Sequence, residues 1–299
     1  MSLVRRCAVM AALALVTPAR GQAQSTLYSD SLLPALRRAA GAVPGAPPQA
    51  VRVLAFNWSR GPASGVVEGG TADSVGRANV VFQIRYPSGW IMVDAGMDRE
   101  IANNPPRFSQ ERYDRVQLAL RDARLIVITH EHYDHIEGVL RSPYLALLQP
   151  KTMLTRAQVQ TLMTGSNPGN IRLDSADAAR YLVVDYDGLL PIAPGVVLIR
   201  APGHTPGSQM VYVRTAQGRE MVLAGDVAWA MAGVEANRQK PETVSQRLHE
   251  DRALIAPQVA WLHGLAAQHV AVVVSHDDAS VSGLVRQGVL ADDLDLKNP

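Results

Sequence analysis

The sequence predicts one α/β domain in which layered β-sheets carry helices on their outer faces. The main observation is that apolar, β-branched runs of strand length alternate with helical patterns from about residue 50 to residue 295. The same stretch contains no internal repeat, low-complexity tract or change of composition that would mark another domain. With 299 residues, of which 47% are hydrophobic and 19% charged, the chain is long enough to bury a large core.

The first 23 residues have the pattern of a secretory signal peptide. The pair Arg5 and Arg6 precedes an apolar run at residues 8–16, and the small residues Gly21 and Ala23 stand where a signal peptidase would cleave. The apolar run is shorter than the roughly 20 residues that cross a bilayer. We therefore expect a periplasmic or secreted protein without stable membrane insertion after cleavage, exported by the Sec or the twin-arginine route.

Cleavage of this segment would change the charge and the cysteine content. Arg5, Arg6 and Arg20 would leave, so Lys plus Arg would fall from 29 to 26 while Asp plus Glu stays at 27, which gives a net charge of −1. That balance does not predict a surface for nucleic acid. The only cysteine, Cys7, would leave as well, so any bound metal must use nitrogen and oxygen ligands.

Residues 24–48 are expected to form a leader or linker before a single domain at residues 49–299. The stretch GAVPGAPP at residues 41–48 is too rich in proline and glycine for regular structure. One short helix is expected around Leu32 to Ala40, before that stretch.

Each element of the domain follows from its own residue pattern. The expected strands are Val51 to Phe56, Asn79 to Tyr86, Trp90 to Val93, Leu125 to Thr129, Val196 to Arg200, Met210 to Val213, Met221 to Ala224 and Val270 to Ser275. The expected helices are Phe108 to Arg121, Thr155 to Thr164 and Glu242 to Ala267. We expect the last helix to break near Pro257, because proline removes a backbone donor.

Five of the expected strands lead into a polar residue that can bind a metal. These residues are Asp94, His130, His204, Asp226 and His276. Strand ends are where a rigid sheet delivers side chains to a common cleft. The five strand ends therefore indicate one site.

The segment HEHYDH concentrates metal-binding side chains within six residues. His130 and His132 are two positions apart, so an extended segment projects both to the same face, and Asp134 and His135 follow as the chain turns. Imidazole and carboxylate groups suit zinc at about 2.0–2.2 Å. One tetrahedral ion cannot easily use all four groups, whereas two ions about 3.5–4 Å apart can. The further ligands would be His204, Asp226 and His276.

The sequence resembles the metallo-β-lactamase superfamily of hydrolases over about residues 50–290. The H-x-H-x-D-H motif of the family is matched by HEHYDH, its second histidine by APGHTPGS, its bridging aspartate by LAGDVAW and its last histidine by VVVSHD. The first family motif, an aspartate after an early strand, is matched by VDAGMD. The resemblance implies a four-layer αββα sandwich with the metals at one edge between the two sheets.

The resemblance also implies a role for each motif residue. The implied ligands of the first metal are His130, His132 and His204. The implied ligands of the second metal are Asp134, His135 and His276. Asp226 would bridge both metals, and Asp94 would steady the ligands through hydrogen bonds. Two zinc ions are the expected cofactor, with iron or manganese as alternatives.

The implied activity is that of a metal-dependent hydrolase that cleaves a lactone, an ester or a related carbonyl bond of a small molecule. A hydroxide that bridges two cations is available at neutral pH, because the cations lower the pKa of water. Asp134 would orient this hydroxide and pass on its proton, while Asp226 holds the metal pair.

The bridging Asp226 indicates the branch of lactonases and glyoxalase-II-like thioesterases. Lactonases that open acyl-homoserine lactones typically carry a tyrosine three residues after this aspartate, where the present sequence has Trp229. Hydrolysis of β-lactam amides, thioester hydrolysis of the glyoxalase II type and iron-dependent persulfide dioxygenation therefore stay as alternatives.

Substrate selection is expected to come from loops. Residues 57–78 form a glycine-rich stretch in which Trp58 would lie against an acyl group or pack on the domain. The other expected pocket walls are segments 141–190 and 229–265, the second with Trp229 and Met231 directly after the bridging aspartate. The sequence leaves the exact substrate, the metal in the cell and the oligomeric state open.

Overall fold

The computed structural model describes residues 27–102, 105–165 and 172–297. The expected signal peptide at residues 1–23 lies outside the described residues. Among the described helices, none combines the length and the apolar character needed to cross a membrane. The described chain folds into two β-sheets with helices on the outer face of each, as the sequence predicts.

The larger sheet has seven strands in the order β12-β1-β2-β3-β4-β5-β6. Its first three strands in the chain form antiparallel pairs, and β3 to β6 run parallel to one another. The strand bounds are β1 Ala50–Pro62, β2 Ser74–Tyr86, β3 Gly89–Val93, β4 Leu125–Val127, β5 Thr152–Thr155, β6 Leu182–Val184 and β12 Ala291–Asp292.

The smaller sheet has five strands in the order β11-β10-β9-β8-β7. Strands β7 to β10 form antiparallel pairs, whereas β11 adds to β10 in parallel. The bounds are β7 Leu189–Ala193, β8 Val196–Arg200, β9 Gln209–Arg214, β10 Glu220–Leu223 and β11 Ala271–Val273.

The two sheets pack face to face across an apolar core. Phe82 and Ile84 of the larger sheet share one buried cluster with Leu198, Val211 and Leu223 of the smaller sheet. Burial of such side chains stabilises the fold by roughly 1.5–3 kcal/mol each before the entropy cost of ordering them. This core joins the sheets rigidly, and their strand ends are therefore held in fixed positions.

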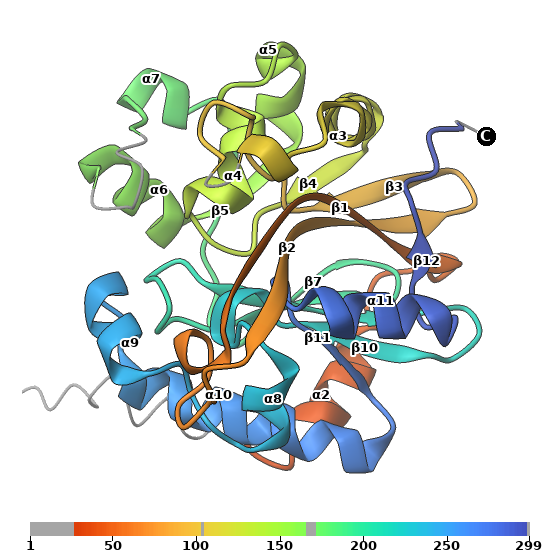
Figure 1. The fold of residues 1–299 in the computed structure, drawn as a ribbon. Coiled ribbons are helices and arrows are strands. Elements are labelled where there is room, and N and C mark those ends of the chain that lie inside the picture. The colour runs from red at the N-terminus through yellow and green to blue at the C-terminus, as the bar shows by residue number, and fades with distance from the viewer. Residues whose placement is uncertain (1–26, 103–104, 166–171, 298–299) are drawn as a thin grey trace, which may run out of the picture.

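Helices cover both outer faces and complete four layers (Figure 1). The helices on the larger sheet are α3 Gln110–Asp122, α4 Tyr133–Leu140, α5 Leu145–Leu148, α6 Arg156–Thr164 and α7 Ser175–Ala178. The helices on the smaller sheet are α2 Leu32–Ala39, α8 Met231–Glu235, α9 Glu242–Leu248 and α10 Arg252–Leu265. Helix α11 Asp278–Arg286 packs its apolar residues against the core between the sheets. Short 3-10 turns are η1 Ala63–Gly65, η2 Pro105–Arg107, η3 Gln149–Lys151, η4 Gly225–Val227 and η5 Ala266–Gln268.

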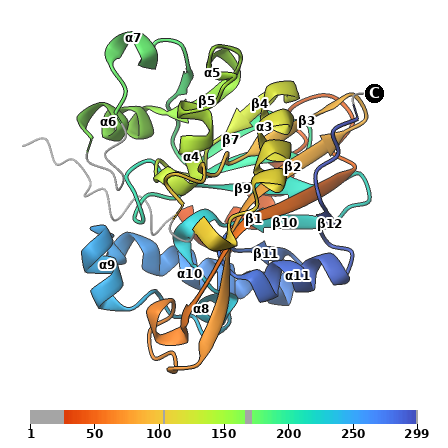
Figure 2. The same cartoon turned by 45° about the horizontal axis from the view of Figure 1, so that its top comes forward.

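All eight expected strands are present, but the expected loop at residues 57–78 is wrong. Strands β1 and β2 continue to pair as far as Pro62 and Ser74, so only residues 63–73 connect them. The backbone ladder, in which the register shifts once between Ala55 and Asn57, satisfies the hydrogen-bonding groups of both strands and outweighs the low strand propensity of glycine. Figure 2 shows the resulting hairpin, in orange, extending past the sandwich beside α8. Strands β5, β6, β7 and β12 were not predicted, because short strands have little pattern of their own.

The expected break near Pro257 is also wrong, since α10 continues through this residue. The helical stretch is interrupted earlier, where His249 takes a left-handed backbone with φ of 57° and ends α9. Asp251 then begins α10 by accepting hydrogen bonds from the backbone of Ala253 and Leu254. Glu250 lies within the interruption, and its side chain is only 1% exposed.

The expected leader at residues 24–48 is part of the folded domain from residue 27 onward. Helix α2 buries Leu32, Leu33 and Leu36 in the cluster under the smaller sheet. Tyr28 donates its hydroxyl hydrogen bond to the carbonyl of Arg200 at 2.6 Å. This segment therefore completes a helical layer instead of linking two parts.

We expect Leu36→Ala to lower the free energy of unfolding by about 2–5 kcal/mol, because Leu36 is fully buried and its loss leaves a cavity. Denaturant titration measures the change. The matched control is Arg38→Ala in the same helix, which alters an exposed side chain and should shift stability by less than about 0.5 kcal/mol. Equal stability of the two variants would show that α2 is not integral to the core.

Candidate metal centre

The five polar residues at strand ends come together at one edge of the sandwich. Asp94 follows β3 and His130 follows β4, whereas His204, Asp226 and His276 come after β8, β10 and β11 of the other sheet. Side chains of both sheets therefore meet where the strands end. The remaining motif residues, His132, Asp134 and His135, come from the loop after β4 and the first turn of α4.

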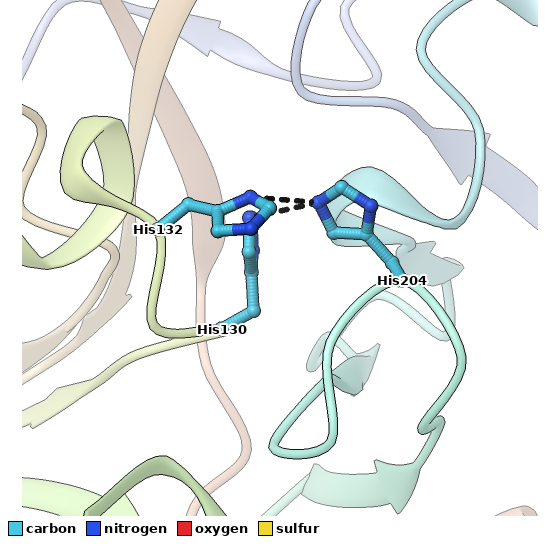
Figure 3. Close-up of side chains that lie close together, drawn as sticks. All are labelled: His130, His132 and His204. Atoms are coloured by element: carbon cyan, nitrogen blue, oxygen red, sulfur yellow. Dashed lines mark hydrogen bonds between the residues drawn. The ribbon is translucent and has the colours of Figure 1, made fainter. Parts of the chain in front are cut away.

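The first cluster consists of three buried histidines, His130, His132 and His204. Nε2 of His204 lies 3.2 Å from Nε2 of His130 and 3.0 Å from Nδ1 of His132 (Figure 3). In a tetrahedral zinc site with Zn–N bonds of 2.0–2.1 Å, neighbouring nitrogens lie about 3.3 Å apart. The three nitrogens therefore have the spacing of ligands around one ion.

The second cluster consists of Asp134, His135 and His276. Nε2 of His135 lies 3.4 Å from Nε2 of His276, and Oδ2 of Asp134 lies 3.7 Å and 3.5 Å from these two nitrogens. The side chains of Asp134 and His276 are 16% and 12% exposed, whereas His130 and His204 are only 1% exposed. Solvent therefore reaches the site from the second cluster.

Asp226 stands between the two clusters. Its Oδ2 lies 3.5 Å from Nε2 of His204 in the first cluster and 3.2 Å from Nε2 of His276 in the second. Its Oδ1 is buried and accepts no hydrogen bond, although Nε2 of His135 is 3.4 Å away. A buried carboxylate oxygen without a donor is costly, so this position fits an atom that a cation would contact.

Hydrogen bonds at Nδ1 fix the orientation of four histidines. Nδ1 of His135 faces Asp94 at 2.8 Å, Nδ1 of His204 faces Glu250 at 2.5 Å and Nδ1 of His276 faces the carbonyl of Ala78 at 3.0 Å. These partners accept hydrogen bonds, so each Nδ1 donates and each Nε2 faces the centre of the site. His130 follows the same pattern, because the Thr129 hydroxyl next to its Nδ1 already donates to Asp94.

The charges of the site complement a cation. Burial lowers the pKa of His130, His132 and His204, so these imidazoles are neutral and their lone pairs would repel one another without a positive ion between them. Burial opposes protonation of His135 too, but the carboxylates of Asp226, Asp94 and Asp134 outweigh it and raise the pKa of His135. The residues present therefore fit divalent metal ions.

A family model described as a beta-lactamase superfamily domain matches residues 89–261 of the chain. The chain belongs to this superfamily. The match runs from strand β3 to helix α10, so it includes every motif residue except His276. The expectation from the sequence motifs is confirmed at the level of the family.

The chain is also similar to curated proteins and, in its fold, to solved structures. The chain is 24% identical over 184 residues to the N-acyl homoserine lactonase AiiA of Bacillus thuringiensis subsp. kurstaki, a match that covers 52% of this chain and 65% of that protein. An N-acyl homoserine lactone hydrolase solved with N-hexanoyl-L-homoserine at its catalytic metal centre shares the fold with a TM-score of 0.61, at 16% identity, over 79% of this chain and 96% of that chain. AidC, a dizinc quorum-quenching lactonase, gives a TM-score of 0.53 at 14% identity, over 76% and 86% of the two chains.

In this superfamily member, Asp94 lies against the candidate ligand His135. It is fully buried, and its φ of 63° is a left-handed conformation that few residues other than glycine adopt. Its carboxylate accepts hydrogen bonds from the backbone and the hydroxyl of Thr129, at 2.7 and 2.9 Å, in addition to His135. Asp94 therefore ties strand β3 to the histidine loop.

Close packing of a glycine brings this loop to Asp94. A Cβ on Gly138 in α4 would lie 2.1 Å from the carbonyl oxygen of Ala95, so only glycine allows the helix this close to the chain after β3. The backbone amide of Gly138 donates to the carbonyl of Gly96 at 2.8 Å. The close packing of helix α4 on the segment after β3 therefore fixes the position of His135 relative to Asp94.

Several residues that contact the candidate ligands were not predicted from the sequence. Asn79 donates a hydrogen bond to Oδ2 of Asp134 at 3.0 Å, and Asn57 donates to Asn79 at 2.9 Å. Glu250 accepts from His204 and forms an ion pair with buried Lys240 at 2.8 Å. These residues lie far from the motifs in sequence, and a lone Asn, Glu or Lys has no pattern that would indicate its role.

The three expected pocket residues, Trp58, Trp229 and Met231, lie in different parts of the structure. Trp229 is half-buried beside the site, where its indole N–H donates to Oδ2 of Asp226 at 2.7 Å and its ring lies 6.1 Å from that of His276. Met231 packs against the cluster under the smaller sheet, and Trp58 against the core between the sheets. Of these three residues, the structure brings Trp229 into contact with a candidate ligand.

We expect His132→Ala to lose about one metal ion per chain, because the first cluster keeps only two nitrogens. Elemental analysis after dialysis against metal-free buffer measures the change. The control is His249→Asn, since His249 is exposed and lies in a left-handed conformation that asparagine tolerates. Unchanged metal content in the alanine variant would contradict the ligand assignment.

Proposed function

We propose that the protein is a dinuclear zinc hydrolase that opens a lactone or ester bond of a small molecule. The observation that carries the proposal is the pair of ligand clusters joined by Asp226 at one sheet edge. His130, His132 and His204 would hold one ion, and Asp134, His135 and His276 the other. The lactonase relatives support this class of bond, although the match spans only 65% of their length.

Two bound divalent cations would supply a water of lowered pKa and polarise the substrate carbonyl. Asp134 is the carboxylate best placed to act on that water, because it lies on the exposed side of the site. The amide of Asn79 fixes one of its oxygens. Asp134 would orient the nucleophile and later transfer a proton to the leaving alkoxide oxygen.

Trp229 distinguishes this chain from a lactonase that has tyrosine at the corresponding position. An indole N–H donates a hydrogen bond but does not exchange its proton near neutral pH, so Trp229 would not act as a general acid. Its hydrogen bond instead holds Asp226, and its ring would form an apolar wall beside His276. Proton transfer then depends on Asp134.

A hydrolysis panel on the zinc-loaded protein tests the substrate class. The panel contains an acyl-homoserine lactone, a simple aryl ester, a glutathione thioester and a cephalosporin, each followed under the same conditions. We expect turnover of the lactone or the ester and none of the cephalosporin. Turnover of the cephalosporin alone would overturn the proposal in favour of a β-lactamase, and turnover of the thioester alone in favour of a glyoxalase II type of activity.

Metal analysis tests the class of chemistry. About two zinc ions per chain are expected in the active protein, because each cluster offers three ligands and shares Asp226. One iron per chain together with oxygen consumption on a persulfide would instead identify a dioxygenase. Reconstitution of metal-free protein with zinc, iron or manganese shows which ion restores hydrolysis.

We expect Trp229→Phe to lower kcat by about tenfold with little change in KM, because the ring remains while a hydrogen bond to a charged group is lost. Trp229→Ala should raise KM as well, since the apolar wall is removed. Steady-state kinetics on the best substrate of the panel separates the two effects. Wild-type kcat/KM in both variants would refute a role for Trp229 in the site.

A further inference from the structure

Lys240 is a buried lysine that contacts residues of the candidate metal centre and residues next to it. Its side chain is only 1% exposed. Its Nζ donates to the carbonyl oxygen of Asp226 at 2.5 Å and to Oε1 of Glu250 at 2.8 Å, and it lies 5.3 Å from the centre of the Trp229 ring. Each of these partners is a candidate ligand or touches one.

Glu250 extends this contact to the first cluster. The same oxygen that pairs with Lys240 accepts the hydrogen bond from Nδ1 of His204 at 2.5 Å, and the other oxygen accepts from the hydroxyl of Ser245 at 2.7 Å. Both oxygens of Glu250 therefore accept hydrogen bonds, and its side chain is only 1% exposed. Because a carboxylate accepts, Nδ1 of His204 donates to Glu250 and Nε2 of His204 is left to face the cluster.

Lys240 and Glu250 together connect two ligands that come from different strands. His204 lies in the loop after β8, and Asp226 lies in η4 after β10. Glu250 lies in the short segment between α9 and α10. A buried ion pair of this kind is rarely more stabilising than apolar residues of the same size, so stability alone does not account for it.

We propose that Lys240 and Glu250 are positioning residues that set the affinity and the ligand geometry of the metal site. Glu250 fixes the ring orientation of His204 and makes its Nε2 a stronger donor to a metal, as carboxylates behind ligating histidines do. Lys240 holds Glu250 in place, fixes the backbone of Asp226 and packs on Trp229. The inference rests on the proposed function in that it requires a metal at this site.

The test measures zinc affinity by competition with a chromophoric chelator, and so does not depend on turnover. The variants are Lys240→Met, Glu250→Gln and the double variant that carries both changes. We expect each single variant to bind zinc about 10- to 100-fold more weakly than the wild type. The spectrum of the cobalt-substituted protein should also change, because the ligand field depends on how His204 and Asp226 are held.

The double variant separates positioning from stability. It removes both buried charges, so the metal-free double variant should unfold at a higher temperature than metal-free Lys240→Met, which leaves Glu250 unpaired. Its zinc affinity should nevertheless stay at least tenfold below that of the wild type, since no carboxylate supports His204.

Lys151→Met provides a matched control. Lys151 donates to two backbone carbonyls, those of Arg121 and Ala123 at 2.5 and 2.9 Å. It lies in η3, directly before the start of β5, whereas the candidate ligands follow the ends of strands. Its loss should lower the unfolding temperature without a change in zinc affinity or in the cobalt spectrum.

The inference is overturned if Lys240→Met, Glu250→Gln and the double variant all bind zinc as tightly as the wild type, with an unchanged cobalt spectrum. The pair would then serve the fold alone. Absence of zinc binding by the wild type would be a different result, because it would refute the proposed function itself.

Discussion

The structure depends on the mutual electrostatic fit of buried imidazoles and carboxylates at one edge of the sandwich. Neutral histidine nitrogens face one another at 3.0–3.2 Å in the first cluster, and Asp226 has a buried oxygen with no donor. Such an arrangement is unfavourable for the protein alone and becomes favourable when cations stand among the ligands. The surrounding fold must therefore be stable enough to hold these histidine nitrogens and the carboxylate of Asp226 close together.

The scaffold does this by dividing the ligands between two sheets. The apolar core fixes the sheets relative to each other, and each ligand then needs only a short segment to reach the centre. Further contacts tie the segments together: Asp94 joins β3 to the histidine loop, Asn79 of β2 holds Asp134, and Glu250 holds His204. Rigid placement of this kind is what a metal-dependent hydrolase requires, because ligand geometry decides metal affinity and the position of the attacking water.

The exposed side of the site decides how a substrate reaches it. Asp134 and His276 are the ligands most open to solvent, while the first cluster lies deeper. Trp229 lies at this side, and its indole N–H donates a hydrogen bond to Asp226. The local chemistry on this side is therefore an apolar ring next to a carboxylate.

The sequence alone predicted eight of the twelve strands in the described residues and the candidate ligands. Apolar runs of strand length indicate buried strands. The H-x-H-x-D-H motif places four metal-binding side chains within six residues, and this density indicates a metal site. The tertiary structure alone decided how β1 and β2 extend into a hairpin, that α2 belongs to the core, and that α9 ends at His249 rather than near Pro257. It also decided which distant side chains, Lys240 and Glu250 among them, contact the ligands. The physical reason is that a local pattern reflects burial and propensity, whereas contacts such as those of Glu250 with His204, 46 residues apart, are decided by how the sheets and helices pack.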